Sequence, residues 1–440
     1  MKIKKVIIDN IRCFKHIEID LTNNNGVVDW LVILGDNGVG KSTILRSIAL
    51  GLTEESGASG LLDELIGDWI KRDALDKKGF VSLELEPFIG CKEIAIIKTE
   101  FFIDNFKEVK VRQTVTPQKP RTFKWDNLFV CGYGTNRSDF ASEEYNEYTV
   151  TDAIYPQFKY SQKLQSPELI VRRLQSLGIK DREIFSKLEY IMMLDQGSIS
   201  MEFSGIKVSG PWGEKMSYGA LSDGYRVVLS MVTDTFGWKG LVEGSLKKPN
   251  KMKVLIMEGI IIIDELEQHL HPRWQKEIIS LLHNQFPKVQ FIVSTHSPLC
   301  VVGTTELKDE DCIIVSLDRE EDDIKCTRTS PPRGKRADQV LTSYLFDLYT
   351  TSDNSIKRDI ERYKFLLIKP SNETINQEIT DIIQRLDKQI GSSETEFERL
   401  IETAVQKGLE DLTKKKVEKN SPEDYEIRRQ LDDLFDTKPI

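Results

Sequence analysis

Apolar and polar residues alternate over much of the first third of the chain. Residues 1–34 and 78–131 contain stretches such as Val81-Ser82-Leu83-Glu84-Leu85, in which every second residue is apolar. A period of two is typical of strands that bury one face. We therefore expect an antiparallel β lobe here, built around a helix that the spacing predicts for residues 43–52.

Continuous apolar runs indicate a second kind of strand. Ile260-Ile261-Ile262-Ile263 contain no polar side chain, which suits a parallel strand that is buried on both faces. Trp30-Leu31-Val32-Ile33-Leu34 form an apolar strand before a glycine-rich segment. From residue 254 to 316 such strands alternate with helical patterns. The sequence therefore predicts a parallel core sheet with connecting helices.

The segments between these strands differ in pattern. Residues 142–205 are polar with helical spacing, and residues 227–232 begin another apolar helix. Residues 240–253 carry the glycines, lysines and proline that are typical of an exposed loop. A docking helix is predicted for residues 336–349.

Beyond residue 352 the apolar spacing is that of amphipathic helices, predicted for residues 356–367, 375–390 and 394–412. Their apolar stripes must be buried, either on the chain's own core or against a partner or a further dimer. No heptad repeat is sustained over several turns. Long coiled-coil arms are therefore excluded.

The first motif that carries chemistry is Gly-Asp-Asn-Gly-Val-Gly-Lys-Ser at residues 35–42, between a predicted strand and a predicted helix. Glycines let backbone N–H groups turn toward an anion, Lys41 can reach the β- and γ-phosphates, and the Ser42 hydroxyl can hold Mg²⁺. A plain glycine turn would not require Lys41-Ser42 or this context. The residues expected to bind a nucleotide are Gly35, Asp36, Asn37, Gly38, Val39, Gly40, Lys41, Ser42 and Thr43.

Asp264 and Glu265 end the isoleucine-rich run. Ligands of open α/β sheets bind at the carboxyl ends of the strands, so we expect Asp264 to hold Mg²⁺ together with Ser42. Glu265 can accept a proton from an attacking water, which predicts hydrolysis and not only binding. A core strand that ends in a solvated Asp-Glu turn is the alternative interpretation.

Two further segments complete the set. The sequence Leu-Ser-Asp-Gly-Tyr-Arg at residues 221–226 precedes a helix, where Ser222 and Gly224 could face an anion. Ser222 taken alone would be only an N-cap. An apolar strand leads to His296, and a lone histidine at a strand end is more often structural than catalytic. The order of all four segments along the chain changes that expectation.

In this order the sequence resembles an ABC-type ATPase of the group that includes RecF, the SMC proteins and the OLD nucleases. Residues 35–42 resemble its Walker A motif, residues 221–225 its LSGGQ signature, residues 260–265 its Walker B motif, and His296 its switch histidine. Residues 8–14 resemble the opening strand of RecF-like heads.

A narrower resemblance is carried by residues 264–272, which read Asp-Glu-Leu-Glu-Gln-His-Leu-His-Pro. They are similar to the DExExHLHP run of OLD-like and phage-defence ATPases. Residues 336–343 and 346–348 resemble the continuation seen in PtuA-type ATPases of Septu and certain retron systems. The resemblance covers about residues 1–350.

The resemblance implies an α/β fold, namely an ABC-type P-loop ATPase head followed by C-terminal helices. The head would combine a mixed parallel core sheet, an antiparallel β lobe and a helical signature subdomain. The implied ATPase domain spans residues 1–351, with the signature-containing insert at about 142–235. Residues 352–440 would form a helical assembly region.

The resemblance also implies a head-to-tail homodimer, or a higher oligomer of dimers, that binds two ATP molecules and two Mg²⁺ ions. Lys41, Glu265 and His296 would be the catalytic groups of each site, and Ser222 with Gly224 would come from the other chain. The implied function is that of a sensor or scaffold subunit in a bacterial anti-phage complex, controlling a separate HNH or TOPRIM nuclease or a toxin. A RecF-like DNA-repair ATPase and an ATP-bound scaffold with little turnover are the alternatives.

The sequence departs from the family pattern in two places. Asp223 and Tyr225 stand where the signature has Gly and Gln, and an acid beside a phosphate would repel it unless a cation intervenes. No clean Q-loop is visible, and residues 132–137 could equally form a turn with an exposed arginine. The candidates for the Q-loop residue are Gln113, Gln118 and Asn136.

Composition bounds the remaining possibilities. A length of 440 residues with 39% apolar residues allows two or three domains and a sizeable core. The formal charge of -9 is not that of a dedicated DNA-binding domain. Any DNA contact would use the basic segment 159–187, which a solvated helix face also explains. No long apolar run or signal peptide is present, so we expect a cytoplasmic protein without membrane contact.

Cysteines and histidines add little chemistry. The cysteines lack CxxC spacing and lie in or beside predicted strands, so we expect buried thiols at positions 13, 91, 131, 300, 312 and 326. His269 and His271 are the only close histidine pair. A metal site there is conceivable, but two histidines without a third ligand more often pack or cap a helix.

Overall fold

The computed structural model describes residues 1–65, 67–74, 77–87, 93–116, 125, 128–137, 139–141, 145–246, 249–320, 323–343, 345–346, 358–359, 362–363, 365–366 and 373–389. It divides the chain into two compact units, residues 1–340 and 341–440. Each unit is described by itself.

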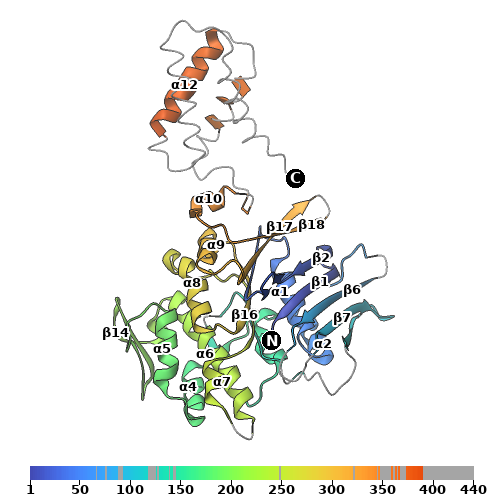
Figure 1. Ribbon diagram of the computed structural model, residues 1–440, viewed down its shortest axis with the longest axis vertical. Coiled ribbons are helices and arrows are strands. Elements are labelled where there is room, and N and C mark those ends of the chain that lie inside the picture. Colours follow the sequence, from blue (N-terminus) through green and yellow to red (C-terminus); the bar gives the residue numbers. More distant parts are fainter. Residues whose placement is uncertain are drawn as a thin grey trace. The chain divides into compact units, whose positions relative to one another are not determined.

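A six-stranded sheet forms the centre of the first unit (Figure 1). Its strands are β5 (Trp30–Gly35), β9 (Val130–Tyr133), β15 (Gly259–Ile263), β16 (Val289–Ser294), β17 (Cys312–Glu320) and β18 (Asp323–Thr329). The order is β18-β17-β5-β16-β15-β9, and all neighbours pair in parallel except β18 with β17. β15 and β16 are buried over their whole length, which explains why apolar residues fill these central parallel strands.

An antiparallel sheet lies beside this core, as the alternating pattern predicts. Its strands are β1 (Ile3–Ile11), β2 (Phe14–Asp20), β6 (Lys78–Leu85), β7 (Ala95–Ile103) and β8 (Val109–Thr116), in the order β2-β1-β6-β7-β8. Helix α1 (Lys41–Gly51) contacts strands of both sheets, and most of its residues are buried. One correction concerns β5 and β9, which belong to the parallel sheet although they lie within or beside the alternating segments.

A helical part occupies the side of the core sheet opposite the antiparallel lobe (Figure 1). Its helices are α4 (Pro167–Ser176), α5 (Asp181–Ile191), α6 (Asp223–Gly244) and α7 (Lys251–Leu255). The short helix α3 (Val150–Ile154) instead contacts β9 and packs in the core beside the antiparallel lobe. A three-stranded antiparallel sheet joins α5 to α6, made of β12 (Ile199–Glu202), β13 (Gly205–Gly210) and β14 (Gly213–Ser217). Helices within residues 142–205 and from residue 227 were expected from the sequence, whereas α7 and this small sheet were not.

The exposed loop predicted for residues 240–253 is wrong over most of its length. Helix α6 continues to Gly244, and α7 covers Lys251–Leu255. The reason is packing, because a Cβ atom added to Gly240 would lie 2.6 Å from Cδ2 of Leu174 in α4. Glycine at this position lets α4 and α6 approach closely and does not mark a turn.

Shorter elements connect the strands. Helices α8 (Pro272–Gln285) and α9 (Pro298–Gly303) follow β15 and β16. The docking helix predicted for 336–349 is reduced to α10 (Ala337–Leu341) among the described residues. The remaining elements are α2 (Glu55–Asp63), β3 (Thr22–Asn23), β4 (Gly26–Val27), β10 (Phe140–Ala141), β11 (Leu164–Gln165) and the 3₁₀ turns η2 (Tyr155–Gln157), η3 (Tyr218–Ala220) and η4 (Thr304–Glu306).

The second unit contains helix α12 (Glu373–Gln389), which confirms the helix predicted for 375–390. Ile382 and Ile383 are buried, and Arg362 and Arg385 form ion pairs with Glu378 and Asp359. Half of the residues in the helix predicted for 356–367 and all of those in the helix predicted for 394–412 lie outside the described residues. In the part of the chain that is described, no helix has the length and apolar character to cross a bilayer.

Candidate nucleotide-binding site

A pocket of about 400 Å³ lies at the carboxyl end of β5 and β15. It is lined by Arg12, Cys13, Asn37, Gly38, Gly40, Lys41, Ser42, Thr43, Asp264, Glu265 and His296. The fold therefore brings together the loop at residues 35–42, the two acids and the histidine that the sequence predicts. Ser222 and Gly224 are not among these lining residues.

The loop depends on glycine because of its close contacts. Gly40 precedes α1 with a φ of +103°, and a Cβ atom there would lie 2.6 Å from Sγ of Cys13 and would also clash with the Phe14 ring. Gly38 has a φ of +82° and lines the pocket. Positive φ values of this kind let backbone N–H groups turn toward one anion, which is the requirement for holding phosphate oxygens.

Lys41 is the cation of the loop. Its Nζ donates hydrogen bonds of 2.7 Å to the carbonyl oxygens of both Gly35 and Asp36. Burial lowers the pKa of the ammonium, while the nearby carboxylates of Asp264 and Glu265 act in the opposite direction. The charge is thus held at the mouth of the loop and faces the acids across the pocket.

The turn after β15 holds the two acids. Asp264 is buried, and its carboxylate accepts a hydrogen bond from the Ser294 hydroxyl at the end of β16. The same hydroxyl accepts from the backbone N–H of Glu265 at 2.8 Å. Glu265 has a φ of +49°, a conformation that residues other than glycine adopt only when their surroundings enforce it. Ser294 thus orders a turn that carries one expected metal ligand and one expected base.

The donor set suits Mg²⁺ with a nucleoside triphosphate. Ser42 at the start of α1 and Asp264 line the same pocket, so a hydroxyl and a carboxylate oxygen can share one hard cation. His296 is fixed from its backbone, because its N–H donates to Oε1 of Glu267 at 2.6 Å. Ser294 and Glu267 are supporting residues that the motif pattern did not identify.

Arg12 and Cys13 are also pocket residues that sequence analysis missed. They form the turn between β1 and β2, where Arg12 has a φ of +48° and its guanidinium lies 5.1 Å from the centre of the Trp69 ring. Nothing in the local sequence marks this turn as a nucleotide contact. Only the pairing of β1 beside α1 brings it to the loop at residues 35–42.

The signature segment begins α6. Ser222 is the N-cap residue of α6 and is exposed. Among the described residues of α6, its hydroxyl caps no backbone N–H group. Gly224 is buried. A Cβ atom there would lie 2.7 Å from the carbonyl oxygen of His269, so the two backbones are in close contact. The signature therefore packs on the loop that follows Glu265, which links the two motifs within one chain.

Both departures from the signature have physical explanations. Asp223 forms an ion pair with Arg226, which lies one turn later in α6. The positive charge of Arg226 therefore compensates the negative charge that Asp223 adds to the signature. The Tyr225 ring lies between two tryptophans, 4.3 Å from the centre of the Trp212 ring and 4.8 Å from that of Trp274. Tyr225 is therefore part of an aromatic cluster of its own chain.

Two candidates for a Q-loop residue, Gln113 and Asn136, are not among the residues that line the pocket. Gln113 donates to the Thr53 carbonyl and the Thr99 hydroxyl in the antiparallel lobe, and Asn136 donates to the Tyr160 carbonyl. Gln118 lies outside the described residues. The alternative for residues 132–137, a turn with an exposed arginine, is wrong because Arg137 is only 2% exposed.

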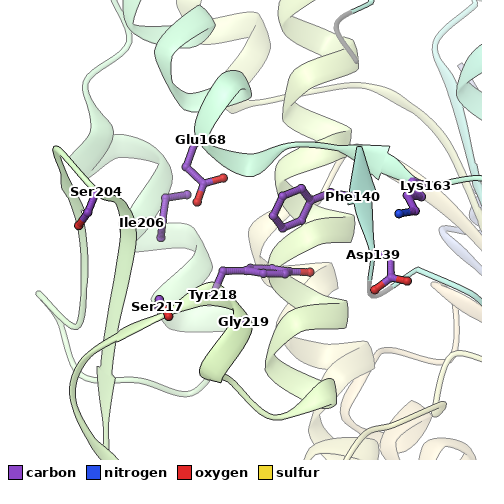
Figure 2. A pocket seen from close by; sticks show the side chains of 9 residues that line it. All are labelled: Asp139, Phe140, Lys163, Glu168, Ser204, Ile206, Ser217, Tyr218 and Gly219. Carbon is purple, nitrogen blue, oxygen red and sulfur yellow. The ribbon is translucent and has the colours of Figure 1, made fainter. Parts of the chain in front are cut away.

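A second hollow of about 400 Å³ lies beside the signature (Figure 2). The rings of Phe140 and Tyr218 meet edge to face with centres 4.6 Å apart, and Glu168 points toward them. The Tyr218 hydroxyl and the Ser230 hydroxyl of α6 are 2.6 Å apart and hydrogen bonded. This hollow shares no lining residue with the nucleotide pocket, but η3 on its wall leads directly into Ser222.

Several basic residues of the segment 159–187 are engaged within the chain. Lys159 pairs with Glu64, Arg182 pairs with Glu189, and Lys187 donates to Gln285. These contacts agree with the interpretation of the segment as a structural, partly solvated face.

Other possible metal ligands have structural roles. His271 caps α8, as expected, by accepting from the Arg273 N–H. Asp29, His283 and Asp311 cluster closely enough to hold an ion. However, Lys2 pairs with Asp29, and the Trp30 indole donates to Nδ1 of His283 at 3.3 Å, so two of these three residues already have partners.

The cysteines largely follow expectation. Cys131, Cys300 and Cys312 are buried, and burial raises the pKa of each thiol. Cys13 and Cys326 are half-buried, and Cys91 lies outside the described residues.

Comparison with known proteins agrees with the geometry. The family described as "AAA ATPase domain" matches residues 1–196, and an AAA domain family matches residues 175–301. The Septu protein PtuA of Bacillus mycoides (strain KBAB4) is 29% identical over 397 residues, which cover 88% of this chain and 50% of that protein. The Retron Vc95 probable ATPase of Vibrio cholerae serotype O1 biovar El Tor is 39% identical over 129 residues, covering 29% of this chain and 23% of that protein.

Among solved structures, the SMC head domain from Thermotoga maritima aligns with a TM-score of 0.43 and 15% identity, covering 75% of this chain and 99% of that chain. The chain spans about half the length of the Bacillus mycoides relative. The motifs, the core sheet and the matching AAA families agree with the P-loop ATPase fold that the sequence predicts, and the chain is similar to the Septu PtuA and retron ATPase proteins.

Proposed function

We propose that the pocket binds ATP with Mg²⁺ and hydrolyses it to ADP, releasing the γ-phosphate. The observation that carries this proposal is the meeting of Lys41, Ser42, Asp264, Glu265 and His296 in one cavity. Ser42 and Asp264 would hold Mg²⁺, which when bound offsets negative charge on the phosphate oxygens. The backbone N–H groups of residues 36–41 would surround the phosphates.

Glu265 is the proposed general base. It would take a proton from a water whose oxygen attacks the γ-phosphorus, while the bond to the bridging oxygen breaks and ADP leaves. Lys41 would stabilise charge that develops on the phosphate oxygens, and His296 would contact the γ-phosphate. Arg12 also lines this pocket and would add a second positive charge.

We further propose a head-to-tail dimer. Ser222 and Gly224 of one subunit would close the nucleotide pocket of the other, because neither residue lines the pocket of its own chain. The exposed Ser222 at the start of a long helix suits a contact with a phosphate. The Asp223 and Arg226 ion pair keeps the approaching face close to neutral.

The biological role that we propose is a cytoplasmic sensor or scaffold subunit in a bacterial anti-phage complex, with a separate nuclease or toxin as its effector. Its support is the similarity to Septu PtuA and retron ATPase proteins. DNA-stimulated turnover without a partner would favour the alternative of a RecF-like repair ATPase. Tight ATP retention with negligible hydrolysis would favour a scaffold that uses ATP as a structural ligand.

Lys41→Ala should weaken ATP binding by about 10- to 150-fold, because a charge-assisted contact to phosphate contributes about 1.5–3 kcal/mol. Calorimetry with ATP and Mg²⁺ measures this change directly. The exposed Lys335 provides the control, since Lys335→Ala should leave the affinity unchanged. Wild-type affinity in the Lys41 variant would contradict the assignment of the phosphate-binding loop.

The C-terminal region is proposed to be an assembly module spanning residues 352–440, next to an ATPase domain at 1–351. A truncation after Thr351 tests this division. We expect the shortened protein to remain soluble and to hydrolyse ATP, but to lose co-purification with its operon partner or to drop from tetramer to dimer in light scattering. Aggregation or loss of ATPase activity would instead make the region part of the core.

A further inference from the structure

We propose that Arg137 is a positioning residue that fixes the backbone of the turn at Asp264 and Glu265, and so directs the Glu265 carboxylate. This inference rests on the proposed role of Glu265 as the general base. It assigns a task in the reaction to a side chain that does not line the nucleotide pocket.

The guanidinium of Arg137 gathers three consecutive carbonyl oxygens. Nη1 donates to the Asp264 carbonyl at 2.6 Å, and Nη2 donates to the carbonyls of Glu265 at 2.6 Å and Leu266 at 3.3 Å. Nη1 also donates to the Gly134 carbonyl at 3.0 Å, which anchors the side chain to its own strand end. A rigid, planar fork of N–H donors can bind such a set at once, whereas a lysine ammonium cannot match this geometry.

The turn that Arg137 holds is under strain. Glu265 has a φ of +49°, and its N–H is held on the opposite side by the Ser294 hydroxyl. The turn after β15 is thus fixed from the two strands that flank β15, by Ser294 at the end of β16 and by Arg137 after β9. A residue other than glycine keeps a positive φ only while such contacts enforce it. Losing the guanidinium would let the turn relax and move the carboxylate.

Burial makes this arrangement costly, which argues for a specific geometric role. Arg137 is only 2% exposed, and its Nε has no hydrogen-bond partner among the described residues. Burial lowers the pKa of the guanidinium to about 10, against the opposing effects of Asp264, Glu267 and Glu265. The group is therefore still protonated at neutral pH, and its positive charge faces the acids of the site.

The test uses the full chain with Arg137→Lys and Arg137→Gln, each alone and combined with Glu265→Gln. Single-turnover hydrolysis of radiolabelled ATP gives the chemical rate, titration with a fluorescent ATP analogue gives affinity, and thermal unfolding reports the fold. Arg333→Lys is the matched control. Arg333 also donates to two backbone carbonyls, those of Thr305 and Leu307, but it does not line the pocket.

We expect Arg137→Lys to lower the hydrolysis rate by about 10-fold with nucleotide affinity within twofold of wild type, because small displacements of a reacting group are costly. In the Glu265→Gln background the same change should have little further effect, since no base remains to be aimed. Arg333→Lys should hydrolyse at the wild-type rate.

Three results would overturn the inference. They are wild-type hydrolysis in both Arg137 variants, an equal fold-loss in both backgrounds, and loss of the fold in both variants, which would make Arg137 a stability residue. Failure of the proposed function looks different. In that case Glu265→Gln alone would keep its turnover, whatever Arg137 does.

Discussion

Replacing Glu265 by glutamine will lower ATP turnover by at least about 100-fold, the typical contribution of a general base. The amide has nearly the same size as the carboxylate, but it cannot accept the proton of the attacking water. The turn should keep its shape, because Arg137 and Ser294 hold it through the backbone and not through the Glu265 side chain. ATP binding should therefore persist.

Steady-state phosphate release measures the turnover, and calorimetry measures the binding of ATP. Glu258→Gln is the matched control, since Glu258 precedes the same strand β15 at its opposite end and pairs with Lys288 on the surface. That variant should hydrolyse ATP normally. Unchanged phosphate release from Glu265→Gln would exclude this residue as the base and would shift attention to another group in the pocket.

Most of the predicted site residues that line the pocket belong to contiguous sequence motifs. Lys41 and Ser42 follow a strand and begin a helix, and Asp264 and Glu265 end a buried strand, so local patterns alone place them at the edge of a parallel sheet. The structure brings them into one pocket without any further assumption.

Arg12, Arg137 and Ser294 could not be located in this way. Each contributes through a contact between segments distant in sequence, such as the 127 residues that separate Arg137 from Asp264. A lone arginine after a strand has the same local pattern as an exposed turn. Only the pairing of β9 beside β15 reveals that its guanidinium is surrounded by carbonyl oxygens.

The error at residues 240–253 has a related cause. Gly237, Gly240 and Gly244 are spaced like one face of a helix, and they meet Ile170, Leu174 and Leu177. Glycines at such spacing can indicate two helices in close contact as well as a flexible loop. The contact with the partner helix α4, which lies much earlier in the sequence, decides between these interpretations.

Ser222→Arg should weaken ATP-dependent dimerisation by about 100-fold, since disruption at the centre of an interface typically costs 2 kcal/mol or more, here about 3 kcal/mol. The expected cause is steric. The arginine side chain would occupy the exposed start of α6 and would block the approach of the other subunit's phosphate.

Light scattering of the Glu265→Gln protein, with and without ATP, measures the effect, because slow hydrolysis should hold the dimer closed. Ser245→Arg is the matched control, since Ser245 is also exposed and caps the opposite end of α6. Dimerisation lost with Ser222→Arg but kept with Ser245→Arg would assign the contact to the signature end of the helix. An ATP-tightened dimer that survives Ser222→Arg would contradict the head-to-tail arrangement. ATP binding by each isolated subunit should remain normal in both variants, because neither serine lines the pocket of its own chain.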